Sequence, residues 1–318
     1  MSILSSPVSP VALIAGPTAS GKSAIALTLA HRLSETGRRG VIINADSAQV
    51  YADLRVLSAR PSEDEMEGVE HRLFGAWDGA EACSAAAWAE RAKAAISVCH
   101  ASDAVPILVG GTGLYLKVLL EGIAPIPAID PDVRAMVRGL PDDGAYKLLQ
   151  LEDPLRAVEL APNDRQRIAR ALEVKRSTGV TLADWQIAKA GGIGEEIDLH
   201  PLVLLPDRTW LYERCDRRFE AMLQTGAMAE VEALLARELD PDLPVMRAIG
   251  VPEIAAFLTD TLSREDMIAA GQQATRNYAK RQFTWFRRQT PEDWPRIAYQ
   301  GESENIDIST HFASLLRD

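Results

Sequence analysis

Residues 11–23, VALIAGPTASGKS, decide the fold. The first five form an apolar run that is too short for a helix and is typical of a buried strand. The next eight match G-x-x-x-x-G-K-[ST], and after them apolar side chains recur at four-residue spacing at Ile25, Leu29 and Leu33. A strand, a glycine-rich loop and a helix in this order predict a phosphate-binding unit.

Other apolar runs extend this pattern along the chain. Residues 41–43, 105–109 and 202–205 are short, apolar and bounded by turn residues, and each indicates a further buried strand. Between the second and third strands, an alanine-rich helix is expected to bury the face formed by Trp88, Ala92, Ala95 and Cys99. Strands that alternate with helices predict an α/β fold with a P-loop-type, doubly wound parallel sheet.

The pattern of strands alternating with helices ends at Ile123. A proline-rich segment, residues 124–134, precedes about 70 residues with helical patterns and almost no strand signal, which end at a glycine cluster. We expect residues 1–122 to form the first part of the core, 123–199 a helical insertion domain that binds tRNA, and 200–318 the return to the core. The part beyond Leu205 is expected to be helical, with Ser263 and Asp266 at the start of a long helix towards Arg288.

Composition narrows the function classes. The 318-residue chain lacks an apolar run long enough to cross a bilayer, and its N-terminus lacks the pattern of a secretory signal, so we expect a cytoplasmic protein without a membrane partner. Cys83, Cys99 and Cys215 are widely spaced and are interpreted as packing residues. The net charge of −11 does not exclude a nucleic-acid partner, because binding depends on local patches.

The glycine-rich loop is expected to hold a di- or triphosphate. Its glycines let backbone N–H groups approach a phosphate, Lys22 adds a full positive charge, and Ser23 can hold Mg²⁺. The run VPILVGG ends in glycine rather than in the acid that nucleoside triphosphatases use for magnesium, and Asp46 is the nearest substitute. ATP hydrolysis therefore has little support, although a small-molecule kinase using ATP stays an alternative.

Six ordered motifs between residues 11 and 288 resemble one family, the tRNA dimethylallyltransferases. They are GPTASGKS, NADSAQVY from Asn44, LVGGTGLYLKVLLEG from Leu108, NDRQRIARALEV, MRAIG and TRNYAKRQFTWFR. The resemblance implies transfer of an isoprenoid group from dimethylallyl diphosphate to the exocyclic N6 amine of an adenosine beside the tRNA anticodon. No Cys/His zinc module follows Arg288, as in the compact bacterial members.

The resemblance also implies roles for individual residues. Asp46 would be the base that accepts the amine proton, while Lys22, Thr112 and Arg247 would face the diphosphate. The diphosphate-binding residues would be Gly16, Thr18, Ala19, Ser20, Gly21, Lys22 and Ser23. The tRNA-binding residues would be Asp46, Ser47, Ala48, Gln49, Thr112, Arg134, Gln166, Arg167, Arg170, Arg247, Lys280, Arg281 and Gln282. Ser47 and Gln49 would hold the edge of the flipped adenine.

Positive charge is concentrated in two stretches despite the acidic total. Residues 165–176 carry five basic side chains against one acid, and residues 275–288 carry five with none. Such stripes can follow the backbone of a tRNA anticodon stem-loop, with the insertion gripping one side and the protein acting as a monomer. Phe283, Trp285 and Phe286 either pack the last helix or stack on bases. A non-catalytic RNA-binding protein is the third possible function.

Two positions and one stretch depart from the family's pattern. Val251 stands where tyrosine is usual, and Gly75 where aspartate is common. Residues 55–62, RVLSARPS, match the family's Ile-Gly-Thr-Ala-Lys-Pro only loosely. These departures leave open the wall of the prenyl pocket and part of the RNA contact.

Overall fold

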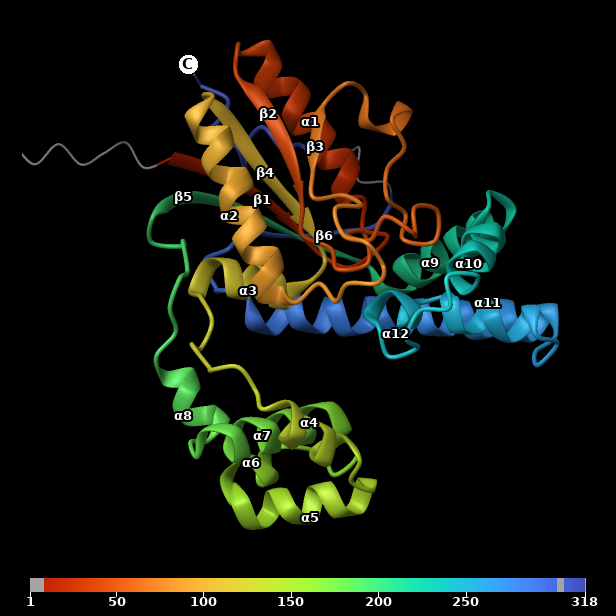
Figure 1. The fold of residues 1–318 in the computed structure, drawn as a ribbon. Coiled ribbons are helices and arrows are strands. Elements are labelled where there is room, and N and C mark those ends of the chain that lie inside the picture. The colour runs from red at the N-terminus through yellow and green to blue at the C-terminus, as the bar shows by residue number, and fades with distance from the viewer. Residues whose placement is uncertain (1–8, 302–305, 318) are drawn as a thin grey trace, which may run out of the picture. The chain divides into compact units, whose positions relative to one another are not determined.

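A computed structural model describes residues 9–301 and 306–317, and the chain divides into two compact units (Figure 1). One unit contains the chain up to Leu119 and again from Ile193, and the other is the insertion Leu120–Gly192. The insertion was predicted at 123–199. It ends earlier because a strand already begins at Ile197.

The first unit is built on a six-stranded sheet in the order β3-β2-β4-β1-β5-β6, and every pair of neighbours is parallel. The predicted α/β fold with a parallel sheet is confirmed. The strands are β1 (Ser9–Ala15), β2 (Arg39–Asn44), β3 (Glu70–Arg72), β4 (Ala104–Gly110), β5 (Ile197–Pro206) and β6 (Arg296–Tyr299).

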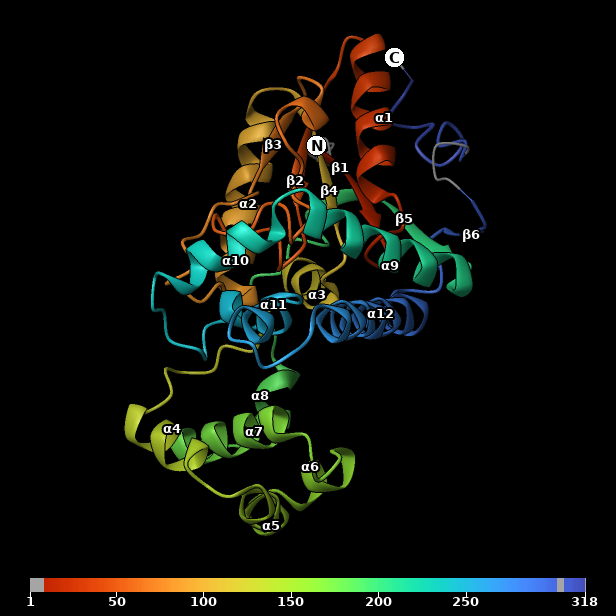
Figure 2. The ribbon, with the colours of Figure 1, turned by 90° about the vertical axis from the view of Figure 1, so that its right-hand side faces the viewer.

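Both faces of the central strands are buried, which explains their continuous apolar runs. Alternate residues of β1 face opposite ways: Leu13 packs in one core, and Ala12 and Ile14 in the other. The core around Ala12 includes α1 (Lys22–Glu35), whereas the core around Leu13 includes α2 (Ala85–Ala101). Figure 2 shows the strands between these two helices.

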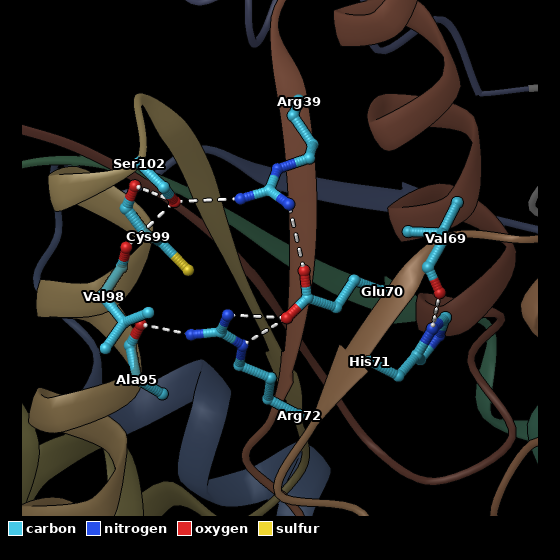
Figure 3. A network of polar contacts seen from close by, with 9 residues as sticks. All are labelled: Arg39, Val69, Glu70, His71, Arg72, Ala95, Val98, Cys99 and Ser102. Carbon is cyan, nitrogen blue, oxygen red and sulfur yellow. Dashed lines mark hydrogen bonds and ion pairs between the residues drawn. The ribbon is translucent and has the colours of Figure 1, made fainter.

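Two edge strands were not predicted from the sequence. β3 is polar, and Glu70 bridges two arginines on its own strand and on β2, at 2.6 Å from Arg72 and 3.4 Å from Arg39 (Figure 3). The expectation that the chain is helical beyond Leu205 is wrong at β6, which pairs with the end of β5. Both strands are short and only half-buried, so neither presents the apolar run that marks a central strand.

The remaining helices of this unit lie on the face that contains Leu13 and at the carboxyl end of the sheet. Ser263 caps the longest one by accepting a hydrogen bond from the Asp266 N–H at 3.1 Å, as the sequence predicts. These helices are α3 (Gly113–Glu121), α9 (Arg208–Gln224), α10 (Ala227–Leu235), α11 (Val251–Leu258) and α12 (Arg264–Gln289), with short 3₁₀ turns at Asp64–Met66 and Pro244–Arg247.

The insertion is helical and has its own small core. Residues such as Leu149, Ile168 and Leu172 pack together in it. Its two ends are joined by paired backbone hydrogen bonds between Ile123 and Ala190. Its helices are α4 (Pro131–Arg138), α5 (Asp142–Glu152), α6 (Pro154–Glu159), α7 (Arg165–Thr178) and α8 (Leu182–Ile187).

Candidate active site at the carboxyl ends of the strands

The glycine-rich loop connects β1 to α1 as the sequence predicts. Gly21 has φ +78° at the helix N-cap, and Gly16 has φ +156°. A Cβ on Gly16 would lie 2.6 Å from the Leu204 carbonyl oxygen of β5, so only glycine lets the loop begin there. Ala19 also has a positive φ, +62°, a conformation that the surrounding structure must enforce.

The inside of this loop suits an anion. Burial lowers the pKa of Lys22 from 10.5 to about 8, although the nearby carboxylate of Asp46 partly counteracts it. Its Nζ donates to the Pro17 carbonyl oxygen at 2.6 Å. Ser20 Oγ is buried and has no hydrogen-bond partner within the described ranges, while the side chain of Ser23 is exposed at the start of α1. A loop with a partly desolvated cation and an orphaned hydroxyl can bind a phosphate group.

Asp46 lies just beyond β2, where its backbone is fixed from two sides. Its N–H donates to Asn44 Oδ1 at 2.9 Å, and Asn44 Nδ2 donates back to the Asp46 carbonyl oxygen at 3.0 Å. One carboxylate oxygen caps the following turn by accepting the Ala48 N–H at 3.0 Å. The residue is only 9% exposed, yet it lines a cavity. The second carboxylate oxygen is thus available for a substrate.

Thr112, beyond β4, is tied directly to the segment that follows β2. Its Oγ1 accepts the Ser47 N–H at 2.9 Å and donates to Ser47 Oγ at 3.1 Å. Its own N–H donates to the Ala45 carbonyl oxygen at 3.2 Å. Carboxyl ends of parallel strands meet at one edge of a sheet, and here they bring the two sequence-predicted motifs into contact.

Gln49 reaches a neighbouring loop. Its Nε2 donates to the carbonyl oxygens of Ala59, at 2.7 Å, and Ser58, at 3.2 Å. The same loop is held by Glu230 of α10, whose carboxylate accepts the three successive N–H groups of residues 55–57 at 2.7–3.0 Å. The loop that matches the family pattern poorly is therefore anchored by a group distant in the sequence.

A cavity of about 290 Å³ connects these elements. Its polar lining includes Thr18, Asp46 and Arg281, and its apolar lining includes Leu54, Phe219 and Met222. The cavity is thus large enough for a small apolar group beside polar, charged ones. The rest of its lining is Ser47, Ala48, Tyr51, Leu57, Ser58, Cys83, Tyr115, Cys215, Arg218, Pro244, Arg247, Ala248, Ile249, Thr275 and Tyr278.

Arg218 of α9 is a site residue that sequence reasoning missed. Its guanidinium donates to Thr18 Oγ1 of the phosphate loop, and burial lowers its pKa, with the charges of Cys215 and Asp46 acting in the opposite direction. The spacing of α9 contains a signal. Cys215, Arg218 and Met222 follow one another at three and four residues, so this arginine shares a face with buried side chains.

Tyr278 of α12 is a second missed residue. Burial raises the pKa of its phenol, which also lies against the hydroxyls of Thr112 and Ser47. It shares the face of α12 that contains the buried residues Thr275 and Gln282. Arg281 lies over its ring, at 5.6 Å from the centroid.

The other predicted site residues on and near α12 differ in their exposure and contacts. Arg247 lines the cavity, but its side chain is 60% exposed and pairs with Asp242. Lys280 is exposed, whereas Gln282 is 5% exposed with its amide bonded to backbone. Of the three aromatic residues, Phe286 is fully buried, Trp285 packs on Gly113, and Phe283 lies under Arg208.

The insertion presents its predicted residues on and around α7. Glu173 is only 3% exposed and lies 3.2–4.0 Å from three arginines, Arg134, Arg138 and Arg170. Gln166 is exposed, and the side chain of Arg167 is 71% exposed. A carboxylate buried among three cations is fully paired and leaves net positive charge at the surface.

Comparisons with known proteins agree with this geometry. The sequence model of the IPP transferase family matches residues 49–289. The tRNA dimethylallyltransferase of Erythrobacter litoralis is 69% identical over 288 residues, which is 91% of each chain. The chain belongs to the IPP transferase family, and the resemblance seen in its motifs is confirmed.

Two solved structures show the same fold. The full-length tRNA isopentenylpyrophosphate transferase of Bacillus halodurans has a TM-score of 0.69 and 30% identity, covering 96% of both chains. A eukaryotic dimethylallyltransferase acting on tRNA has a TM-score of 0.77 and 26% identity, covering 96% of this chain and 77% of its own. These relatives do not favour a small-molecule kinase.

The described part of the chain lacks two further features. Within residues 9–301 and 306–317, no helix combines the length and apolar character needed to cross a bilayer. The same ranges contain no group of three or more His, Cys, Asp or Glu side chains that could hold a metal ion.

Proposed function

We propose that the chain transfers the dimethylallyl group of dimethylallyl diphosphate to N6 of the adenosine beside the anticodon of a tRNA, releasing diphosphate. The observation that carries this proposal is a single cavity bordered by the phosphate loop at Thr18, by the arginine that bonds to it, and by Asp46. Such a cavity can hold a diphosphate leaving group and an amine nucleophile together.

The groups at the diphosphate end of the cavity stabilise the charge of the leaving group. As the allylic C–O bond breaks, negative charge grows on the departing diphosphate, and the loop amides, Lys22 and Arg218 stabilise that charge. Ser23 would hold Mg²⁺, which would neutralise part of the diphosphate charge when bound. The orphaned Ser20 hydroxyl and the exposed Ser23 hydroxyl at the helix start are consistent with such a phosphate and metal load.

The nucleophile end supplies a base. The exocyclic amine of adenine is weakly nucleophilic because its lone pair is delocalised into the ring. As its nitrogen bonds to the allylic carbon, its proton passes to the carboxylate oxygen of Asp46 that does not cap the turn. The hydroxyl of Ser47, the residue after Asp46, is hydrogen-bonded to that of Thr112 at 3.1 Å, and the pair would orient a flipped base.

The protein would contact the backbone of the RNA in addition to the target base. Exposed cations of α7 in the insertion, with Lys280 and Arg281 on α12, suit phosphate contacts along an anticodon stem-loop. We propose that the protein works as a monomer in the cytoplasm, with each unit supplying one set of contacts.

One assay separates the alternatives. The protein is incubated with labelled dimethylallyl diphosphate, Mg²⁺ and an anticodon stem-loop, and in parallel with ATP and small hydroxyl acceptors. Prenylated RNA in the first reaction supports the proposal. A phosphorylated acceptor would support a kinase instead, and stem-loop binding without either product would leave a non-catalytic RNA-binding protein.

A further inference from the structure

Gln282 of α12 joins two segments that are far from it in sequence. Its Oε1 accepts the backbone N–H of Thr18 in the phosphate loop at 2.7 Å. Its Nε2 donates to the carbonyl oxygen of Gly111 at 2.8 Å. Both ends of one amide, 5% exposed as a residue, are thus bonded to backbone of two different motifs.

The contact at Gly111 has no spare room. A Cβ at Gly111 would lie 2.2 Å from Gln282 Nε2 and 3.1 Å from the Gly16 carbonyl oxygen. The amide, the start of the phosphate loop and the glycine turn beyond β4 are therefore in direct contact. A side chain at position 111 would displace the amide from its hydrogen bonds.

The helix itself directs Gln282 inwards. Thr275, Ala279, Gln282 and Phe286 are all buried, at spacings of three and four residues, whereas Lys280 points to solvent. The residue sits within the basic stretch, but on the opposite side of α12 from the exposed Lys280. Its position favours an internal role over an RNA contact.

We propose that Gln282 is a positioning residue that fixes the phosphate loop against the Gly111 turn. Thr18 is then held from two sides, at its N–H by Gln282 and at its hydroxyl by Arg218. The residue following Gly111 is Thr112, so the same clamp sets the distance between the phosphate loop and the hydroxyl pair beside Asp46. This inference deepens the proposed function and rests on it for the identity of the diphosphate.

The test replaces Gln282 by methionine, which has similar length and cannot donate or accept at those positions. One or two buried backbone groups lose their partners, so we expect the Kd for inorganic diphosphate with Mg²⁺ to rise about 10-fold to 100-fold. The kcat/KM for dimethylallyl diphosphate should fall by a similar factor. The Kd for the anticodon stem-loop should stay unchanged, which a direct RNA contact would not allow.

A matched control lies on the same helix. Gln272 donates its amide to Glu220 at 2.8 Å, and Gln272→Met should leave all three quantities unchanged. A second variant, Gly111→Ala, attacks the clamp from the other side and should reproduce the loss of diphosphate binding with intact Gln282. It keeps the inference testable if Gln282→Met fails to fold, as judged by circular dichroism and melting temperature.

Two results would overturn the inference. One is a folded Gln282→Met protein that binds diphosphate normally, and the other is a variant whose main loss is in stem-loop affinity. Failure of the proposed function is distinguishable, because it would appear in the wild-type protein as absent prenyl transfer. Diphosphate binding by the wild type, weakened in the variant, would support the clamp even then.

Discussion

The sheet unit and the insertion hold their functional side chains in different ways. Around the cavity, the side chains of Asp46 and Thr112 accept backbone N–H groups at 3.0 and 2.9 Å, and Asp46 is only 9% exposed. In the insertion, Arg167 and Arg170 are 71% and 42% exposed in their side chains and pair with the acidic residues Asp164 and Glu173. Bond making requires groups held to fractions of an ångström, whereas attraction to a phosphate backbone tolerates mobile charges.

The largest expected effect is at Asp46. Asp46→Ala should lower kcat for prenyl transfer by about 10²–10⁴-fold, because the base is lost, while the stem-loop Kd stays unchanged. Asp46→Asn keeps an oxygen that can cap the Ala48 turn and should be as inactive as the alanine variant. Recovery of activity in the asparagine variant would show that the turn, rather than the base, is what the reaction needs. Single-turnover rates and binding titrations supply both quantities.

A substitution of Arg218, which the sequence did not reveal, tests whether this arginine belongs to the side chains that are held in place around the cavity. Arg218→Met should lower kcat/KM for dimethylallyl diphosphate by about 10²–10³-fold, since it removes a donor aimed at developing charge. Arg217 precedes it on α9 and is exposed, so Arg217→Met is the matched control with unchanged kinetics. Equal losses in both variants would mean that general charge, and not the contact with Thr18, is responsible.

A substitution in the insertion should change stem-loop binding rather than the KM for dimethylallyl diphosphate. Arg167→Ala should raise the stem-loop KM by a few-fold, roughly threefold to tenfold, and reduce the slope of log Kd against log salt by about one, with the donor KM unchanged. Lys147 of α5 is also 71% exposed and carries the same charge, so Lys147→Ala serves as the control. An altered donor KM in the Arg167 variant would break the proposed division of labour.

The smallest effect concerns stability of the metal-free, ligand-free protein. Because the pKa of Lys22 is lowered to about 8, the folded state carries a disfavoured charge at pH 7. Lys22→Met should therefore raise the free energy of unfolding by about 1–3 kcal/mol there, while it weakens diphosphate binding. The folded protein loses the Lys22 proton at a lower pH than the unfolded chain does. The stability of the wild type therefore rises between about pH 8 and 10.5, and the difference in the free energy of unfolding between Lys22→Met and the wild type shrinks. Denaturant titrations at pH 7 and pH 10 measure it, and a difference that does not change with pH would contradict this origin.

Local motifs made much of the fold and part of the site predictable. The phosphate loop and the segments at Asp46 and Thr112 each lie directly after an apolar strand, so their neighbours in sequence reveal their place in the sheet. The edge strands β3 and β6 lack that signal, because a half-buried strand needs no continuous apolar run.

The rest of the site depends on contacts between distant segments. Arg218 lies 200 residues from Thr18, and its helix has other arginines nearby, so charge alone could not select it. Helical spacing would have placed it on the buried face. The place of Gln282 required the structure, because the sequence puts it among the basic residues of α12 and only its burial separates it from them.

A backbone hydrogen bond joins the two points where the insertion interrupts the sheet unit. The N–H of Ile193 donates to the Leu119 carbonyl oxygen at 3.0 Å, so the sheet unit's chain leaves and re-enters at adjacent points. Closing such a gap with a short glycine-containing turn carries little entropic cost. The sheet unit could accordingly be made without the helical insertion, and other small helical domains could be grafted at the same junction.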